Sequence, residues 1–314
     1  MTSTRSVVFV NPVRTAIGTF GGSIKEVAAP DLGAAAIKAA IGRAGLKPDD
    51  VDTVVMGNVI QAGVKMNPAR QAAIHAGLPV TVPAMTVNRV CGSGAQAVVS
   101  AAQEILLGTM DVAVAGGMEI IPIDVSGRKG PIIFDRDEHN RPKTTVEALA
   151  ALKPAFRTDG TITAGNAPGI NSGAAALVLT DRQWAEAHGL APVATLISYG
   201  IAAVEPGMFG LGPIPAVRQA LARAGWQLGD IERIEINEAF AAIVIAVARE
   251  LGLPGDIVNV EGGAIAHGHP IGATGAVLLT RLIHSMQRDG LRRGIVTLCI
   301  GGGQGIALAI EMVS

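Results

Sequence analysis

The residue whose surroundings most favour chemistry is Cys91, in the segment NRVCGSGAQA. It follows an apolar run, residues 82–90, and precedes a helical run of small residues, 95–107, which predicts a turn between a strand and a helix. The free N–H groups and partial positive charge of a helix N-terminus favour thiolate over thiol and can hold a carbonyl oxygen. The pattern indicates a nucleophile, with a cysteine simply packed in the core as the alternative.

Three further segments carry groups that could act together with a nucleophile. Asn237 precedes an apolar helix expected at 239–250, where its side chain could cap that helix or hold a water molecule. His269 lies in the loop GGAIAHGHPIGATG and could move a proton between a thiol and an oxyanion; a histidine in a surface turn is the alternative. Cys299 ends an apolar strand that runs into glycines, among them Gly301, which expose backbone N–H groups or simply form a hairpin.

Composition excludes several classes of protein. The 314 residues are 49% hydrophobic and 16% charged, which indicates a well-buried globular chain with room for two domains. A net charge of -1 and the lack of a basic run argue against nucleic-acid binding. No apolar run approaches the roughly 20 residues of a membrane helix, and the N-terminus does not resemble a signal peptide. We therefore expect a cytoplasmic protein that binds neither nucleic acid nor membrane.

The two cysteines do not form a metal-binding pattern. They lie far apart in the sequence among scattered histidines, without the spacing of zinc ligands, so no metal site is expected. A disulfide between them is conceivable, but a large chain without a signal peptide more often keeps its thiols reduced.

An internal repeat defines the organisation of the chain. The segment AGLKPDDVD at 44–52 returns as AGWQLGDIE at 224–232, each after an alanine-rich helical pattern and before an apolar strand. Later, VAVAGG at 112–117 is matched by VTLCIGG at 296–302. Helices that alternate with short apolar strands predict a layered α/β fold, so the repeat predicts two similar α/β halves.

The segments outside the repeat are less regular. Residues 120–160 combine prolines, glycines and mixed charges, which predicts an exposed connection with one short helix at 144–152. A glycine- and asparagine-rich loop follows at 161–173 and leads into a strand at 174–179. At the N-terminus, a strand at 6–10 is expected to end in a proline-containing turn.

In this order, the segments resemble the signatures of the thiolase family over nearly the whole chain. The similar blocks are VNPVRTAIGTFGG, NRVCGSGAQAV, AVAGGME, TAGNAPGINSGAA, NEAFA, GGAIAHGHPIGATG and CIGGGQG. The resemblance implies two similar halves that form a layered αβαβα core, with a Cys-His-Cys site at the floor of a coenzyme A tunnel. It divides the chain into two core halves, 1–119 and 186–314, a remnant of the loop domain at 120–160, and a return to the first half at 161–185.

The resemblance also implies a mechanism for each residue. Cys91 would be acylated after activation by His269, and Cys299 would exchange a proton with the α-carbon of the second thioester. His269 and a water held by Asn237 would stabilise the enolate oxygen, while the N–H groups of Cys91 and Gly301 would bind the acyl carbonyl. The expected reaction is condensation of acetyl-CoA or thiolysis of a short 3-oxoacyl-CoA. Coenzyme A is thus a substrate, and no permanently bound cofactor is expected. Ketoacyl synthases resemble this pattern but use two histidines, so Cys299 favours a thiolase.

The chain departs from the family after Glu119, where several tens of residues are absent. In the family, that part carries a tetramerisation hairpin and several walls of the tunnel. Pro168 stands where serine is common and has no N–H to donate, and Phe209 replaces a methionine and would narrow the acyl pocket. The residues implied to contact coenzyme A are Arg141, Phe156, Ala164, Gly165, Pro168, Phe209 and Phe240.

Two alternatives to a coenzyme A-dependent thiolase remain open. The first is a catalytically weak or silent thiolase-fold scaffold with impaired coenzyme A binding, and the second is an acyltransferase that uses another acyl donor. The family resemblance implies a homodimer formed through the strand at 82–90. His267, two residues before His269, is interpreted as a local variant.

Overall fold

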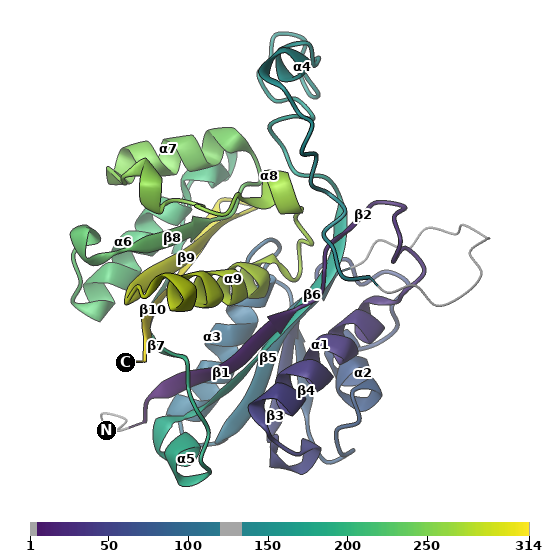
Figure 1. Cartoon of the computed structure of the whole chain (residues 1–314), viewed down its shortest axis with the longest axis vertical. Coiled ribbons are helices and arrows are strands. Elements are labelled where there is room, and N and C mark those ends of the chain that lie inside the picture. Colours follow the sequence, from purple (N-terminus) through teal and green to yellow (C-terminus); the bar gives the residue numbers. More distant parts are fainter. Residues whose placement is uncertain (1–4, 120–133, 314) are drawn as a thin grey trace.

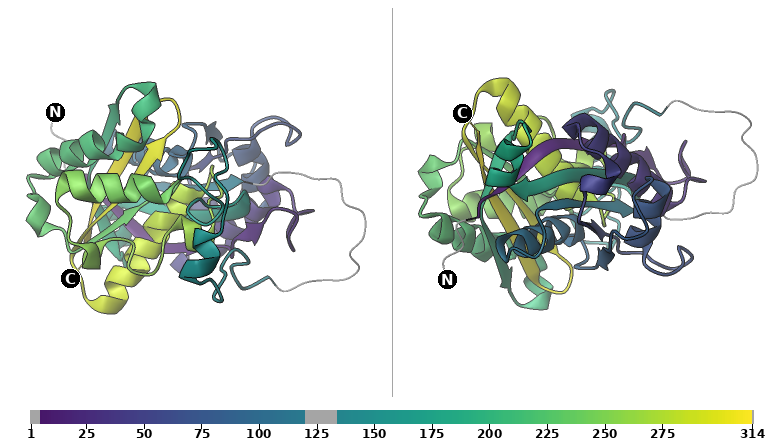
Figure 2. Two further views of the ribbon diagram at one scale, coloured as in Figure 1. Left: turned by 90° about the horizontal axis from the view of Figure 1, so that it is seen from above. Right: turned by 90° about the horizontal axis from the view of Figure 1, so that it is seen from below.

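The computed structural model describes residues 5–119 and 134–313. Its strands form one long sheet in the order β4-β3-β5-β6-β1-β7-β10-β9-β8, with the short β2 beside β6. The two halves of this sheet meet where β1 and β7 pair over only two residue pairs. Figure 2 shows the result: the N-terminal half, purple to blue, lies beside the C-terminal half, green to yellow.

The N-terminal half of the sheet has parallel strands at its outer edge and antiparallel strands toward the middle. Its strands are β1 Val7–Arg14, β2 Gly18–Thr19, β3 Thr53–Gly57, β4 Ala84–Val87, β5 Val112–Glu119 and β6 Asn171–Asp181. Its helices are α1 Ala29–Ala44, the 3₁₀ helix η1 Pro48–Asp50, α2 Pro68–His75, α3 Ser93–Leu106, α4 Val146–Ala150 and α5 Arg182–Ala187.

The C-terminal half repeats this arrangement, with β8 and β9 parallel and β9, β10 and β7 antiparallel. Its strands are β7 Ala194–Ala203, β8 Arg233–Ile236, β9 Arg293–Ile300 and β10 Gln304–Met312. Its helices are η2 Pro206–Leu211, α6 Pro213–Ala224, η3 Leu228–Asp230, α7 Ala241–Leu251, η4 Gly255–Ile257, α8 Ala264–His267 and α9 Thr274–Asp289.

The apolar faces of the helices and of the sheet pack together into five layers. Helices α3 and α9 lie in the centre, where their buried side chains pack against both halves of the sheet in one hydrophobic core. A second core joins α1 and α2 to the outer face of the N-terminal half, and a third joins α6 and α7 to the outer face of the C-terminal half. Figure 1 shows these helices on either side of the strands. The expected αβαβα layering is confirmed.

The sequence repeat corresponds to a repeated local structure. Helices α1 and α6 each end at a left-handed glycine, Gly45 with φ +74° and Gly225 with φ +69°. In the 3₁₀ turns that follow, Asp50 and Asp230 each accept the backbone N–H three residues earlier, at 2.7 Å and 2.8 Å. Because the same residue types make the same bonds in both copies, the two halves are confirmed as structural equivalents.

The observed elements differ from the expected ones mainly at their ends. The first strand does not stop at a proline turn: β1 continues through Asn11, which has φ +44°, and Pro12 as an irregularity in the register with β6. A bulge accommodates a proline because the missing N–H falls outside the regular ladder. The run at 82–90 is regular only over β4, because the side chain of Asn88 accepts the Val90 N–H at 3.0 Å and turns the chain.

The expected connection after β5 is confirmed where the structure describes it. Residues 134–160 contain one short helix, α4, and no strand, as their composition predicts. Figure 1 shows α4 standing away from the two halves. The rest of the predicted connection, 120–133, lies outside the described residues.

Candidate active site

Cys91 lies in a strained turn between β4 and α3. The preceding Val90 has φ +45°, which is a costly conformation for a β-branched residue. Ser93 stabilises the turn because its hydroxyl donates to the Val90 carbonyl at 2.7 Å and accepts the Arg89 N–H at 2.9 Å. Cys91 is 8% exposed. The expected strand-to-helix position of the cysteine is confirmed, and the strained residue, Val90, lies immediately before it.

Glycines allow the helices that follow Cys91 and His269 to touch at their N-termini. A Cβ atom on Gly94 of α3 would lie 2.8 Å from the backbone nitrogen of Ala276 in α9. A Cβ on Gly275 of α9 would lie 2.3 Å from the backbone nitrogen of Ala95 in α3. Real Cβ atoms do not approach backbone so closely, so the two helix starts require glycine at both positions. The cysteine and histidine loops therefore converge at one end of the core.

The segment that contains Cys299 and Gly301 reaches the N-termini of α3 and α9 from the end of β9. Cys299 is fully buried near the end of that strand, and a Cβ on Gly92 would lie 2.6 Å from the side chain of the next residue, Ile300. The backbone N–H of Gly301 lies near the Cys91 sulfur, where it lowers the pKa of the thiol. Cys299 is also close enough to Cys91 for a charge on one thiol to affect the other. Both cysteines are free thiols in this arrangement.

Burial dominates the acidity of both cysteines. It raises the pKa of Cys91, although N–H groups of Gly301 and of Cys91 itself oppose the change. It raises the pKa of Cys299 to about 12, with a further increase from the nearby Cys91 and an opposing effect of the Ala239 N–H. The helix N-terminus was expected to favour the thiolate of Cys91, and the N–H groups there do lower the pKa of its thiol, but desolvation of the sulfur has the larger effect. Both cysteines rest as thiols.

His269 is held by contacts on three sides. The backbone N–H of His269 donates to Asn171 Oδ1 at 2.9 Å, and the side-chain amide of Asn171 donates to the Gly18 carbonyl at 3.1 Å. Its Nδ1 lies 2.6 Å from Thr274 Oγ1, and its Nε2 lies 3.5 Å from Asn237 Nδ2. Burial lowers the pKa of His269 to about 4, so the ring is neutral at pH 7. A neutral, oriented imidazole can accept a proton from a thiol.

Asn237 does not cap a helix. Helix α7 begins at Ala241 with Phe240 as its N-cap, so the capping interpretation is wrong. The buried Asn237 follows β8, and its backbone N–H donates to Thr297 on β9 at 2.9 Å. Its Nδ2 faces His269, and its Oδ1 has no hydrogen-bond partner among the described residues. The side chain therefore belongs to the site.

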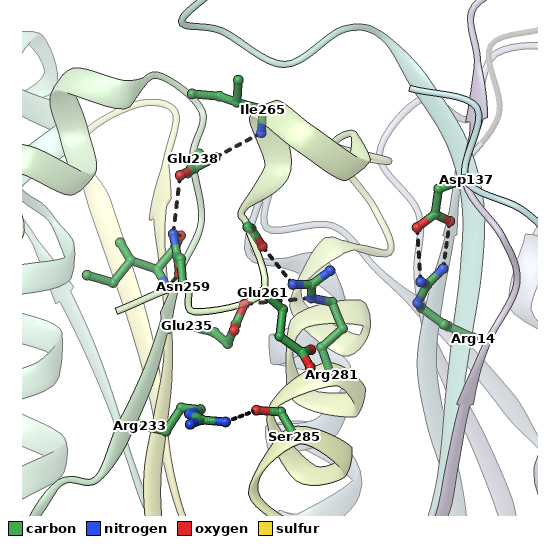
Figure 3. A network of polar contacts seen from close by, with 12 residues as sticks. Arg14, Asp137, Arg233, Glu235, Glu238, Asn259, Glu261, Ile265, Arg281 and Ser285 are labelled. Atoms are coloured by element: carbon green, nitrogen blue, oxygen red, sulfur yellow. Dashed lines mark hydrogen bonds and ion pairs between the residues drawn. The ribbon is translucent and has the colours of Figure 1, made fainter. Parts of the chain in front are cut away.

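Glu238 links Asn237 to the histidine loop. Its carboxylate accepts the N–H of Ile265 in α8 at 2.9 Å and the side-chain amide of Asn259 at 3.4 Å, as Figure 3 shows. A Cβ on Gly263 would lie 2.2 Å from the Glu238 carboxyl carbon, so the loop glycine makes room for this contact. The sequence pattern did not single out Glu238, Asn171 or Thr274, although each lies inside a quoted block.

His267 is buried but lies outside this group of contacts. It ends the single-turn helix α8, and Gly268, with φ +101°, reverses the chain before His269. Its ring nitrogens have no hydrogen-bond partner among the described residues. Burial lowers the pKa of His267 well below its usual value, and the charges of Arg281 and Arg14 add to the effect.

The residues proposed for coenzyme A contact gather only in part. Phe156, from the loop after α4, packs edge-to-face on Phe240 with ring centroids 6.1 Å apart. The loop at 161–169 joins them, because the Ala241 N–H donates to the Asn166 carbonyl at 2.9 Å. This loop carries Ala164, Gly165 and Pro168, which are partly or fully exposed.

The two remaining members of that set behave differently. Phe209 of η2 packs partly buried against the third core. Arg141 is exposed on the connection before α4. That connection is fixed at its start, where Asp137 accepts two hydrogen bonds from Arg14 at 2.8 Å and 3.0 Å, and Glu138 accepts the N–H groups of Thr19 and Ser23.

Over residues 5–119 and 134–313, no group of three or more histidine, cysteine or acidic side chains is arranged to hold a metal ion. Over the same ranges, none of the helices combines the length and hydropathy needed to span a membrane.

The comparisons with known proteins agree with this geometry. A model of the thiolase N-terminal domain matches residues 7–121 and 118–183, and a model of the thiolase C-terminal domain matches residues 190–312. The chain belongs to the thiolase family. An acetyl-CoA acetyltransferase of Chromobacterium violaceum is 42% identical to this thiolase over 388 positions, which cover 97% of this chain and 99% of that protein. The acetyl-CoA acetyltransferase of Escherichia coli is 42% identical over 393 positions, with 99% and 100% covered.

Solved structures support the same assignment. The crystal structure of a Bacillus anthracis acetyl-CoA acetyltransferase has a TM-score of 0.95 and 37% identity, and covers all of both chains. Human mitochondrial 3-ketoacyl-CoA thiolase in complex with CoA has a TM-score of 0.92 and 33% identity, with 100% of this thiolase and 99% of that chain covered. This thiolase is therefore an enzyme of the acyltransferase class.

The alignments also show what this thiolase lacks. The match to the Chromobacterium protein spans 388 positions, and this thiolase has 314 residues, so at least 74 aligned positions have no residue of this chain opposite them. The two N-terminal domain matches meet at residues 118–121, the place after Glu119 where the sequence pattern lacks several tens of residues.

Proposed function

We propose that this thiolase forms an acyl-enzyme on Cys91 and transfers acetyl or short acyl groups between coenzyme A thioesters. The observation that carries this proposal is the convergence of Cys91, the Gly301 N–H and Cys299 at the point where β9 meets the N-terminus of α3. Relatives named acetyl-CoA acetyltransferase support acetyl-CoA as the substrate. The candidate site contains a nucleophile, a base, a second acid/base group and N–H donors, which are the groups that a two-step acyl transfer requires.

In the first step, Cys91 attacks a thioester or 3-oxo carbonyl while His269 Nε2 takes the thiol proton. A neutral imidazole suits this task because it can accept a proton without first losing one. The N–H groups of Cys91 and Gly301 stabilise the oxyanion. When the acyl group comes from a thioester, the sulfur–carbon bond to coenzyme A breaks, and the leaving thiolate takes the proton from His269.

Cys299 exchanges a proton with the α-carbon of the substrate. During thiolysis, the adduct formed by Cys91 collapses, the carbon–carbon bond breaks, the acetyl-CoA enolate leaves, and the Cys299 thiol donates its proton to that enolate. The high pKa of Cys299 keeps this proton in place until the enolate forms. His269, protonated in the first step, and a water held by Asn237 stabilise the enolate oxygen. In the second step, the Cys299 thiolate takes the thiol proton of coenzyme A, the coenzyme A sulfur attacks the acyl group, and the departing Cys91 thiolate recovers its proton from His269. The resting protonation states therefore suit the thiolysis direction.

The proposal also assigns the residues that contact coenzyme A. We assign the acyl and pantetheine contacts to the aromatic pair Phe156 and Phe240, to Phe209, and to the loop with Ala164, Gly165 and Pro168, and the nucleotide contact to Arg141. We interpret 1–119 and 186–314 as the two core halves, 120–160 as a remnant of the loop domain, and 161–185 as a return to the first half. The absent positions would then remove tunnel walls, and loss of two or three contacts worth about 0.5–1.5 kcal/mol each weakens binding by roughly ten- to a thousandfold.

A homodimer follows from the edge of the sheet. Strand β4 ends the sheet and, among the described residues, pairs only with β3. Its Met85 is 41% exposed. At the opposite edge, Asn259 covers Ile236 with two side-chain hydrogen bonds of 2.8 Å and 2.9 Å. Because an open strand edge can pair with another strand, we propose that β4 meets its copy in a homodimer.

We also propose a cytoplasmic location for the enzyme. Its two free thiols suit a reducing compartment such as the cytoplasm.

Two measurements test the function and separate it from the alternatives. The protein should cleave acetoacetyl-CoA in the presence of coenzyme A, and Asn237→Ala should slow cleavage on the order of 100-fold, the usual effect of losing one donor to an oxyanion. Calorimetric titration should show coenzyme A binding weaker than micromolar. Cleavage only of small non-CoA thioesters would favour another acyl donor, and absence of cleavage of every thioester would favour a silent scaffold.

A further inference from the structure

A buried hydroxyl lies directly behind the His269 ring. Thr274, fully buried in the first turn of α9, has its Oγ1 2.6 Å from His269 Nδ1 and 2.8 Å from the Pro270 carbonyl oxygen. A threonine hydroxyl has one hydrogen, and a carbonyl oxygen only accepts. Because two oxygens at 2.8 Å require a hydrogen between them, the hydroxyl donates to Pro270. It can therefore only accept from His269.

The contact on the opposite side of the ring also favours a hydrogen on Nδ1. Nε2 faces the amide nitrogen Nδ2 of Asn237 at 3.5 Å, and an amide NH₂ group only donates. A hydrogen on Nε2 would place two N–H groups against each other and leave Nδ1 facing a hydroxyl whose hydrogen is already used. A hydrogen on Nδ1 satisfies Thr274 and leaves a lone pair toward Asn237.

We propose that Thr274 is a positioning residue that keeps the hydrogen of neutral His269 on Nδ1, so that Nε2 is the base. The use of Nε2 rests on the proposed function, but the tautomer is a property of the resting protein. A hydroxyl differs from a carboxylate in this position because it orients the ring without stabilising its charged form. His269 then holds a proton from Cys91 only briefly and returns it to the leaving group.

The tautomer can be measured directly. Long-range ¹H–¹⁵N spectra of the ¹⁵N-labelled protein at pH 7 distinguish imidazoles protonated on Nδ1 from those protonated on Nε2, and His269→Asn identifies the signals of this ring. We expect His269 to be protonated on Nδ1. Thr274→Ser should preserve that pattern, whereas Thr274→Val, which keeps the shape and removes the hydroxyl, should populate the Nε2-protonated form.

Thr280→Val is the matched control. Thr280 is buried on the same helix, and its hydroxyl has no hydrogen-bond partner among the described residues, so its loss should leave the His269 signals unchanged. In the thiolysis assay, Thr274→Val should lower kcat on the order of 10- to 100-fold, the scale for losing a group that orients a functional histidine, with KM little changed. Thr274→Ser should restore most of that loss.

The outcomes separate this inference from the proposed function. A His269 ring protonated on Nε2 in the unsubstituted protein would overturn the role of Thr274, whatever the activity. An unchanged tautomer in Thr274→Val would overturn it as well. Absence of acyl transfer in the unsubstituted protein would overturn the proposed function, while the spectra would still decide the tautomer.

Discussion

At the scale of residues, the site combines two thiols of raised pKa with a histidine of lowered pKa. This combination does not hold a preformed thiolate–imidazolium pair, because burial disfavours both charged forms. In the proposed mechanism, charge develops only as Cys91 attacks, and the Gly301 N–H already lies beside its sulfur. The donors around the site therefore act mainly on the transition state and do little to change the resting state.

The two cysteines should differ in reactivity toward iodoacetamide. Cys299 is fully buried with a pKa of about 12, whereas Cys91 is 8% exposed and lies near the Gly301 N–H. Peptide mapping after brief treatment at pH 8 should find the label on Cys91 first, and labelling should accelerate as the pH rises. In the Cys91→Ser control, label uptake should fall to a small fraction. Preferential labelling of Cys299 would show that the nucleophile is wrongly assigned.

The types and spacing of the residues predicted much of the site but not its acidity. Cys91, Asn237, His269 and Cys299 were identifiable because each lies where an apolar run meets glycines or small residues. The sequence did not reveal that the pKa of Cys91 is raised. Local spacing identifies the helix N-terminus, but the desolvation of the sulfur depends on the rest of the core. Thr274 and Glu238 were missed since their roles depend on partners that fold back over them.

At the scale of elements, two helix starts in contact hold the site together. Gly94 and Gly275 let α3 and α9 approach at their N-termini, and the cysteine and histidine loops follow from that approach. The glycines of both blocks were visible in the sequence, but the reason for them was not, because each glycine is required by a backbone from the other half of the chain.

Substitution of Gly275 tests this arrangement. In Gly275→Ala the new Cβ would lie 2.3 Å from the Ala95 nitrogen, so the helices must separate, and we expect a loss of roughly 1–3 kcal/mol in unfolding free energy. Gly42→Ala is the matched control: Gly42 is exposed in α1, its Cβ would meet nothing within 4 Å, and the change should stabilise by about 0.5–1 kcal/mol. Urea unfolding measures both. Equal stability of the two variants would contradict the close helix approach.

At the scale of the whole molecule, two equivalent halves provide different parts of the site. The N-terminal half supplies the Cys91 turn, and the C-terminal half supplies Asn237, His269 and Cys299. The repeat and the layers were predictable from the sequence because alternating helices and strands leave few ways to bury their apolar faces. The early end expected for β1 was wrong, because a bulge with antiparallel neighbours accommodates Pro12.

Assembly should follow from the open edge of β4. Sedimentation velocity should show a dimer and no tetramer, because the family resemblance places the tetramerisation hairpin among the positions absent after Glu119. Met85→Glu should shift the dimer toward monomer by placing a charge on β4, whereas Ile245→Glu, at an exposed position of α7, should not. A stable tetramer, or a dimer insensitive to Met85→Glu, would contradict this assignment of the interface.

A buried carboxyl near the site should make stability depend on pH. Glu235 on β8 faces Arg281 of α9 at 3.7 Å, with Arg233, Glu238 and Glu261 nearby (Figure 3), and burial raises its pKa from 4.5 to about 7. The folded state keeps a proton that the unfolded chain loses above pH 4.5, so this group's contribution to stability declines from pH 4.5 to about 7. Glu235→Gln removes that decline. The Tm difference, variant minus unsubstituted, should be more positive at pH 8 than at pH 5, and a difference independent of pH would refute the assigned shift.

The intact mass of the protein after exposure to acetyl-CoA tests directly whether Cys91 forms an acyl-enzyme. Acid quenching traps a covalent acyl-enzyme, and peptide mapping locates it. We expect an acetyl adduct on Cys91 that persists in Cys299→Ala, which lacks the second acid/base group, and disappears in Cys91→Ala. An acetyl group on any other residue, or no adduct at millimolar acetyl-CoA in protein shown to be folded, would contradict the proposed acyl-enzyme on Cys91.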